Sequence, residues 1–180
     1  MARTLYSVTM SLDGFIAGPG GDMSWMTPYI GPNPDADELV GRIGALLVGK
    51  HTFGGDDPHR GTEKQGKPFG GGWEGPQFVL THQVPDKPVP GVTFVADLPA
   101  GLAAARAAAG EKYVNIMGAS VARQLLRAGE LDEVLTFVAP VLLGDGIRLF
   151  AEPGGLHVGM ERIKTTEAPL ATGLWYRVVR

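Results

Sequence analysis

The sequence has no cysteine, a low share of charged residues and no long apolar run, and each of these absences excludes a class of protein. Without cysteine there is no disulfide framework, no thiolate nucleophile and no cysteine metal site. A chain free of cysteine is compatible with a reducing cytoplasm, where we expect it to reside. The most apolar stretch, Leu135 to Leu143, is far shorter than the about 20 residues that a membrane helix needs. We therefore expect no membrane partner.

Three kinds of functional motif are also missing. The 16 basic residues are scattered among 19 acidic ones, so no nucleic-acid footprint is visible. The four histidines form no pair at ligand spacing, which argues against a zinc site or any other metal. No Gly-x-Ser-x-Gly elbow of the hydrolase kind is present. These absences leave a small-molecule substrate as the expected partner.

Glycine and proline are abundant instead. The chain holds 27 glycines and 14 prolines in 180 residues, and glycine alone is at roughly twice its average frequency. Because 44% of the residues are hydrophobic, the chain is too apolar to be disordered, and the excess is expected in ordered loops. Residues 54–76 are the richest part and predict a long surface loop. We expect residues 1–180 to form one domain.

Strand and helix signals alternate over the first two thirds of the chain, which predicts an α/β fold with a largely parallel sheet and helices on its faces. The tail beyond about Leu156 predicts two or three antiparallel strands. Helices are expected at about 33–43, 97–110 and 119–128, and strands at about 5–10, 45–48, 77–81, 92–95, 112–117 and 133–139.

Ligands of such sheets bind beyond the carboxyl ends of the strands, and three strand ends carry suitable residues. The run Gly118, Ala119, Ser120 and Val121 opens a helix with small side chains, so backbone N–H groups could approach a phosphate there. The alternative is a plain tight turn, for which the same small residues suffice.

The other two strand ends carry cationic, imidazole and hydroxyl groups. One is the run GKHT at 49–52, where Gly49, Lys50 and Thr52 suit an anionic ligand, and the other is Thr81 with His82. A Lys–His pair alone is more often part of a solvated loop, and Thr81 with His82 alone would indicate no site. Together, at the ends of strands in one sheet, they form the arrangement that a dinucleotide needs.

Several ordered motifs give the chain a resemblance to a known superfamily. These are SLDGFIAG at 11–18, MGASVARQLL at 117–126, LDE at 131–133 and PVLLGDGIRLF at 140–150. The sequence resembles the dihydrofolate-reductase-like superfamily, in particular the group related to the reductase domain of the riboflavin-biosynthesis deaminase-reductase. The resemblance covers nearly the whole chain. It implies a three-layer fold with a mixed, mainly parallel sheet and a C-terminal antiparallel hairpin.

The resemblance further implies NADPH as the hydride donor and a homodimeric assembly. The matching cofactor residues would be Ala17 beside the nicotinamide, Gly49, Lys50 and Thr52 at the diphosphate and adenosine, Thr81 and His82 near the 2′-phosphate, and Gly118, Ala119, Ser120 and Val121 at the other helix start. Relatives often carry arginine at the positions of Lys50 and His82. A lysine and an imidazole lack the guanidinium fork that binds phosphate, so NADH stays open as an alternative.

The substrate side of the family is only partly matched. Trp25 falls where relatives place an aromatic side chain near the substrate, but Ile30 stands where folate reductases carry a carboxylate, which disfavours dihydrofolate reduction. Asp13 and Asp57 are the candidate acids, with a turn role as the alternative for both and water as an alternative proton source. The loop 54–76 is a candidate lid whose Phe69 and Trp73 would cover the substrate, or a surface excursion with two packing aromatics.

The resulting hypothesis is an NADPH-dependent reductase of a C=N or C=O bond in a small heterocyclic or ribosylated substrate. In such enzymes the cofactor carries the hydride chemistry and the protein positions it and excludes water. A second hypothesis is a nucleotide-binding or assembly module that kept the fold without the reaction, since fold alone does not establish function.

Overall fold

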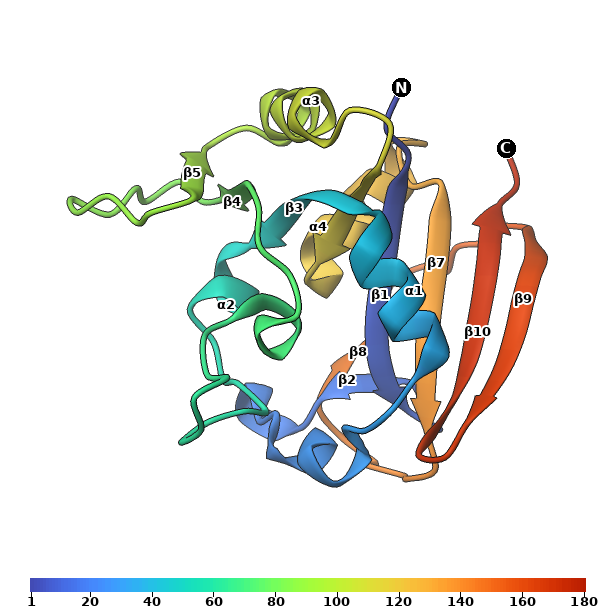
Figure 1. The fold of residues 1–180 in the computed structure, drawn as a ribbon. Coiled ribbons are helices and arrows are strands. Elements are labelled where there is room, and N and C mark those ends of the chain that lie inside the picture. Colours follow the sequence, from blue (N-terminus) through green and yellow to red (C-terminus); the bar gives the residue numbers. More distant parts are fainter.

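The computed structural model describes residues 1–180 and has one eight-stranded sheet at its centre (Figure 1). Neighbouring strands run parallel from β5 to β7, and β10 and β9 then continue the sheet antiparallel. In spatial order the strands are β5 (Val92–Val95), β4 (Gln77–Leu80), β3 (Ile43–Gly49), β6 (Tyr113–Met117), β1 (Thr4–Ser11), β7 (Glu133–Ala139), β10 (Ala171–Val178) and β9 (Met160–Ala168).

The helices cover both faces of the sheet and make three layers. α1 (Pro34–Arg42) packs Leu39 into a cluster on one face with Trp73 and Trp175. α3 (Leu98–Ala109) and α4 (Ala119–Arg127) pack against the opposite face, where Leu102 and Leu125 are buried. The predicted α/β architecture, with its parallel body and antiparallel end, is therefore confirmed.

Two of the helices begin as their sequences predict. The Asn33 side chain accepts hydrogen bonds from the backbone N–H groups of Asp35 and Ala36, and Pro34 occupies the first turn of α1. Asp97 caps α3 in the same way through Ala100 N. By contrast, α4 follows Gly118 without any side-chain cap. Its first-turn N–H groups are therefore free of a side-chain partner.

Two elements were not anticipated, and both follow strand ends. A short pair formed by β2 (Phe15–Ala17) and β8 (Ile147–Arg148) joins the loop after β1 to the loop after β7. A four-residue helix, α2 (Lys50–Phe53), follows β3 directly.

The predicted tail strands are two, β9 and β10, and the loop 54–76 contains a single 3-10 turn at Pro68–Gly71. Further 3-10 turns lie at Pro19–Gly21 and Ser24–Tyr29.

Candidate functional site

The structure brings the predicted phosphate-binding residues together at the carboxyl edge of the sheet. Strand β3 lies between β4 and β6, so the residues that follow these three strands are neighbours. The contact between them is close: a Cβ placed on Gly118 would lie 2.6 Å from Thr52 Oγ1, and one on Gly49 would lie 3.3 Å from Val121 Cγ2. Larger residues at either glycine would close the gap between α2 and α4.

Of Gly49 and Gly118, Gly118 has the backbone that lies nearer to a neighbouring side chain, that of Thr52. Its φ of +109° lies in the region that favours glycine, and it precedes the uncapped first turn of α4. Ala119 and Ser120 add only small side chains there, and Ser120 is exposed. The free N–H groups and the positive end of the helix dipole suit an anionic group. Phosphate binding at this helix start stays a prediction, with a plain tight turn as its alternative.

The remaining predicted phosphate residues are linked through Gln83. Lys50 Nζ donates to Gln83 Oε1 at 2.6 Å, while the Thr81 hydroxyl donates to Gln83 O and accepts from Gln83 N, both at 3.1 Å. Thr81 is buried and His82 is exposed. Lys50 and His82 therefore lie at the rim of the same edge, where the ammonium group keeps donors for a further acceptor.

Asp13 is held by hydrogen bonds rather than directed at open space. Oδ1 accepts from Ser11 Oγ at 2.6 Å and from Leu143 N at 3.1 Å, and Oδ2 accepts from Gly144 N at 2.7 Å. The Ser11 hydrogen bond, followed by those of Gly144 and Leu143, lowers the pKa of Asp13 to about 2. A carboxylate this acidic is a poor proton donor at neutral pH. The structure gives Asp13 a joining role between the β1 and β7 loops.

Replacing Asp13 should therefore affect folding more than turnover. Because its pKa is lowered on folding, Asp13 stabilises the native state above about pH 4, and this contribution fades as the pH falls towards about 2. We expect Asp13→Asn to lower the melting temperature at pH 7 and to reduce the wild-type sensitivity to acid between about pH 4 and 2. Any turnover should fall much less than the about 100-fold loss that follows removal of a general acid. A loss of that size in a folded Asp13→Asn variant would contradict the joining role.

Asp57 also serves the backbone of its own loop. It accepts hydrogen bonds from His59 N at 2.7 Å and from Gly66 N at 2.5 Å. Both contacts favour a turn role for Asp57, which was the alternative to a role as catalytic acid. Its neighbour Asp56, which sequence reasoning passed over, instead reaches a second loop by accepting from Met23 N at 3.0 Å.

The Asp56 contact ties the loop 54–76 to the 3-10 turn that carries Trp25. The pKa of Asp56 is lowered, chiefly by the Met23 N–H and next by the N–H of Asp57. A second link runs from Thr27 Oγ1 to Pro58 O at 3.0 Å. The two loops are therefore fastened to each other on the side of the molecule opposite the chain termini (Figure 1). Whether they open and close as a lid stays a prediction.

The three predicted substrate-side aromatics have different surroundings. Trp25 lies against Tyr29 with ring centroids 6.4 Å apart, and its buried Nε1 has no hydrogen-bond partner. Phe69 is partly buried and has a φ of +52°, an uncommon value for a side chain of its size. Trp73 is only 7% exposed and donates to Ile43 O at 3.2 Å. Trp73 is thus a core residue, as the packing alternative predicts, and its contact with substrate stays untested.

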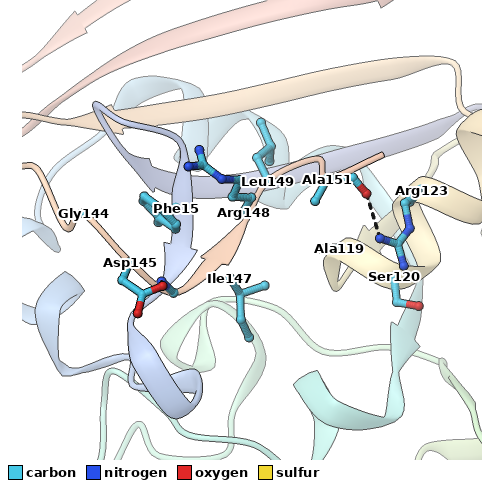
Figure 2. A pocket seen from close by; sticks show the side chains of 11 residues that line it. Phe15, Ala119, Ser120, Arg123, Gly144, Asp145, Ile147, Arg148, Leu149 and Ala151 are labelled. Carbon is cyan, nitrogen blue, oxygen red and sulfur yellow. Dashed lines mark hydrogen bonds between the residues drawn. The ribbon is translucent and has the colours of Figure 1, made fainter. Parts of the chain in front are cut away.

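A cavity of about 460 Å³ opens between the start of α4 and the segment that contains β8 (Figure 2). The run GDG at 144–146, part of the motif PVLLGDGIRLF, forms part of its wall. Gly146 packs against the Ala17 carbonyl with a φ of +134°, which leaves no room for a side chain. Ala17 itself is buried at the end of β2. The lining consists of Phe15, Ala119, Ser120, Arg123, Gly144, Asp145, Gly146, Ile147, Arg148, Leu149 and Ala151.

Comparison with known proteins assigns the chain to a family. The model of the RibD C-terminal domain matches residues 4–169. The chain belongs to the RibD C-terminal domain family. A search of curated protein sequences gave no match.

Solved structures of similar fold include three kinds of protein. A protein from Shewanella described as a riboflavin biosynthesis protein superposes with a TM-score of 0.75 at 24% identity and full coverage of both chains. A bifunctional deaminase and 5-amino-6-(5-phosphoribosylamino)uracil reductase from Thermotoga maritima gives 0.68 at 18% identity, with 99% of this chain covering 57% of that one. Dihydrofolate reductase from Enterococcus faecalis, complexed with NADP(H), gives 0.63 at 16% identity, with 99% and 97% covered. At these identities the likeness establishes the fold.

The RibD C-terminal domain family and the dihydrofolate-reductase-like fold were both anticipated from the sequence motifs, and both are confirmed. None of the helices has the length and apolar character required of a membrane span. Sequence reasoning missed Arg123 and Arg148, because neither lies at the end of a predicted strand. Both arginines line the cavity. Arg148 lies in the β2–β8 pair, which joins segments far apart in the sequence and is therefore not visible in local sequence patterns.

Proposed function

We propose that the protein is a reductase that uses NADPH to reduce a C=N or C=O bond of a small heterocyclic or ribosylated substrate. The observation that carries this proposal is the meeting of Gly49, Thr52 and Gly118 at the uncapped start of α4. Membership of the RibD C-terminal domain family supports the same reaction class. By extension from the family, we also propose that the protein is a cytoplasmic homodimer. Size-exclusion chromatography with light scattering measures the oligomeric state directly.

The carboxyl edge of the sheet fits the phosphate groups of a dinucleotide. A Cβ at Gly118 would fill the space beside Thr52 Oγ1, so the missing side chain leaves backbone N–H groups accessible. Lys50 would lie towards the diphosphate and adenosine, Thr81 and His82 towards the 2′-phosphate, and Ala17 towards the nicotinamide. The bound nicotinamide supplies the hydride. The chain's own residues orient it and keep water out of the reacting space.

No acid in the proposed reductase is assigned as proton donor. Asp13 is anionic at neutral pH, and Asp57 has two backbone N–H groups directed at its carboxylate. Water admitted between the loops is therefore the proposed proton source. This assignment predicts that kcat does not fall steeply as the pH rises, as it would if an essential carboxylic acid lost its proton.

Cofactor binding is the direct test of the proposed function. Titration with NADPH and NADH should quench tryptophan fluorescence and raise the melting temperature. At a concentration 100 times the Kd, stabilisation by about 2.7 kcal/mol corresponds to about 5–10 °C for a domain of this size. We expect NADPH to bind more tightly than NADH, and His82→Ala to reduce the difference between the two affinities, because His82 would lie beside the 2′-phosphate that only NADPH carries.

Turnover separates the reductase from the non-catalytic alternative. NADPH oxidation would be followed across a panel of pterin, flavin-precursor and imine substrates. Oxidation that depends on one substrate supports the reductase. Saturable NADPH binding without turnover on any substrate favours a nucleotide-binding module, and absence of saturable binding by either dinucleotide contradicts both.

A further inference from the structure

A second cavity, of about 230 Å³, lies at the edge of the sheet opposite to the predicted cofactor residues. Strands β1, β6 and β7 begin at this edge, α1 ends there, and both chain termini lie on the same side (Figure 1). The charged residues of its lining are Arg3, Arg42, Lys164, Arg177, Glu38 and Glu133. Three of the ten arginines of the chain therefore meet in one cavity.

The two carboxylates of this cavity are already occupied by donors of the protein. Glu133 is 1% exposed, and its oxygens accept hydrogen bonds from Arg3 Nη1 at 2.6 Å and from two aromatic side chains. Glu38 forms ion pairs with Arg42 at 2.8 Å and with Lys164 at 3.3 Å. A carboxylate that accepts several internal hydrogen bonds has little capacity for an external ligand. The hydrogen-bonding groups that remain for a ligand are therefore donors.

Arg177 has the most donors to spare. It pairs only with Glu161, which is 66% exposed and lies 3.7 Å away, beyond hydrogen-bond distance. Because exposed pairs of this kind contribute little to stability, Arg177 can exchange Glu161 for another acceptor at small cost. The register of the sheet places Arg177 opposite Glu133, which binds Arg3. Arg3 uses one of its N–H groups in that bond, so two neighbouring guanidinium groups keep donors free.

Two aromatic rings hold Arg42 in the wall of the cavity. Its guanidinium lies 5.0 Å from the centroid of the Tyr113 ring and 5.5 Å from that of Trp175, and Nη2 donates to Tyr113 Oη at 3.2 Å. Stacking of this kind fixes the plane of a guanidinium group before a ligand binds. Ile163 is 43% exposed and adds apolar surface to the lining. The cavity thus offers a cationic part and an apolar part.

The balance of charge in the cavity selects the class of anion. Lys164 is neutralised by Glu38 and by a second ion pair, at 2.6 Å, with the buried Asp35. The three guanidinium groups then face the carboxylates of Glu38 and Glu133, which leaves an excess of one positive charge. A carboxylate matches this excess with its single charge and accepts two parallel bonds from a guanidinium group. The two neighbouring glutamates repel a phosphate or sulfate dianion more strongly.

We propose that this cavity binds a small organic acid with one carboxylate and an apolar body. Arg177 and Arg3 are the direct ligands of the carboxylate, and the apolar body packs against Ile163. The ligand joins β10 to the start of β1, so its binding stabilises the folded state. The proposal goes beyond the reductase function and does not depend on it.

Benzoate at constant ionic strength is the probe for this site, and benzamide is its uncharged counterpart of nearly the same shape. We expect benzoate to raise the melting temperature of the wild-type protein and to bind in a calorimetric titration. Benzamide should bind at least about tenfold more weakly, because it lacks the charge that the guanidinium groups recognise. Equal affinities for benzoate and benzamide would overturn the proposal.

Arg177→Ala should weaken benzoate binding by at least about tenfold, because it removes charge-assisted hydrogen bonds to the carboxylate. Without ligand, the melting temperature of this variant should stay within about 3 °C of the wild type, since only an exposed ion pair is lost. Arg177→Lys keeps the charge but not the fork, so its affinity should lie between the two. Arg162→Ala is the matched control, because Arg162 is exposed on β9 outside the cavity lining. It should bind benzoate like the wild type.

NADPH titration at saturating benzoate separates this site from the proposed cofactor site. We expect the NADPH affinity to be unchanged, because the two sites lie at opposite edges of the sheet. Competition between benzoate and NADPH, absence of a wild-type response to benzoate, or equal benzoate affinities of the wild type and Arg177→Ala would overturn the proposal. If benzoate binds through Arg177 but NADPH does not bind at all, the carboxylate site stands and the proposed reductase function fails.

Discussion

Glu133→Ala is expected to lower the free energy of unfolding by about 3–5 kcal/mol, the range found when one partner of a buried charged pair is removed. Glu133 is 1% exposed at the start of β7. Oε2 accepts from Tyr113 Oη and from Trp175 Nε1, both at 2.9 Å, and Oε1 accepts from Arg3 Nη1 at 2.6 Å. Alanine leaves the phenol and the indole buried without an acceptor, since only Arg3 can turn to water.

Urea denaturation followed by circular dichroism measures this loss. The native state of a domain is typically stable by about 5–15 kcal/mol, so Glu133→Ala should lose a large part of its stability, with a fall in Tm of about 10 °C. Glu161→Ala is the matched control, because Glu161 also faces an arginine, Arg177, but is 66% exposed at a distance of 3.7 Å. We expect less than about 1 kcal/mol from that variant.

Glu133→Gln separates charge from hydrogen bonding. The amide oxygen still accepts from one of the two buried donors, so its loss of stability should lie between those of Glu133→Ala and Glu161→Ala. The Tyr113 hydroxyl supplies a second readout, because burial and then the Glu133 carboxylate raise its pKa to about 12. In Glu133→Gln the phenol should titrate at lower pH. Equal stabilities of Glu133→Ala and the wild type would contradict the stabilising role of this network.

The regular elements were predictable because their signals are local. Asn33 and Pro34 mark the start of α1, Asp97 marks the start of α3, and both of these helices begin within a residue or two of their predicted positions. The buried strand at 45–48 was found from its apolar run, although β3 begins earlier, at Ile43. These features depend on neighbouring residues, which a sequence displays directly.

The parts that were missed depend on contacts between distant residues. The β2–β8 pair joins Phe15 to Arg148, and neither short segment has enough apolar alternation to stand out as a strand. Asp13 had two open roles in the sequence, and its contacts with the N–H groups of Leu143 and Gly144, which favour the structural role, join residues too distant in the sequence to be predicted. Trp73 was predicted either to cover the substrate as part of a lid or to pack as part of a surface excursion, and the structure buries its indole in the cluster that contains Leu39.

The candidate phosphate edge was located from sequence because it follows the strand ends, a place fixed by topology. The distances between the residues at these strand ends could not be predicted from the sequence. That Gly118 faces Thr52, and Gly49 faces Val121, follows from the neighbouring positions of β3 and β6. This packing makes the glycine at 118 a requirement of the fold as well as of the proposed ligand.

Gly118→Ala should weaken NADPH binding by about 100-fold, which corresponds to about 2.7 kcal/mol. The new Cβ would lie 2.6 Å from Thr52 Oγ1, so α2 or the start of α4 must move. It would also occupy the space through which a phosphate reaches the first-turn N–H groups. A shift of about 1 Å in a binding group suffices for a loss of this size. Fluorescence titration with NADPH measures it.

Gly129→Ala is the matched control for the backbone strain. Gly129 follows α4 with a φ of +69°, so alanine is disfavoured there as it is at Gly118, but a Cβ would meet nothing within 4 Å. Both variants should lose about 1–2 kcal/mol of stability from the unfavourable φ. Gly129→Ala should nevertheless bind NADPH as the wild type does. Equal NADPH affinities of the two variants would contradict the placement of the cofactor at the start of α4, because the strain common to both would then account for every effect of Gly118→Ala.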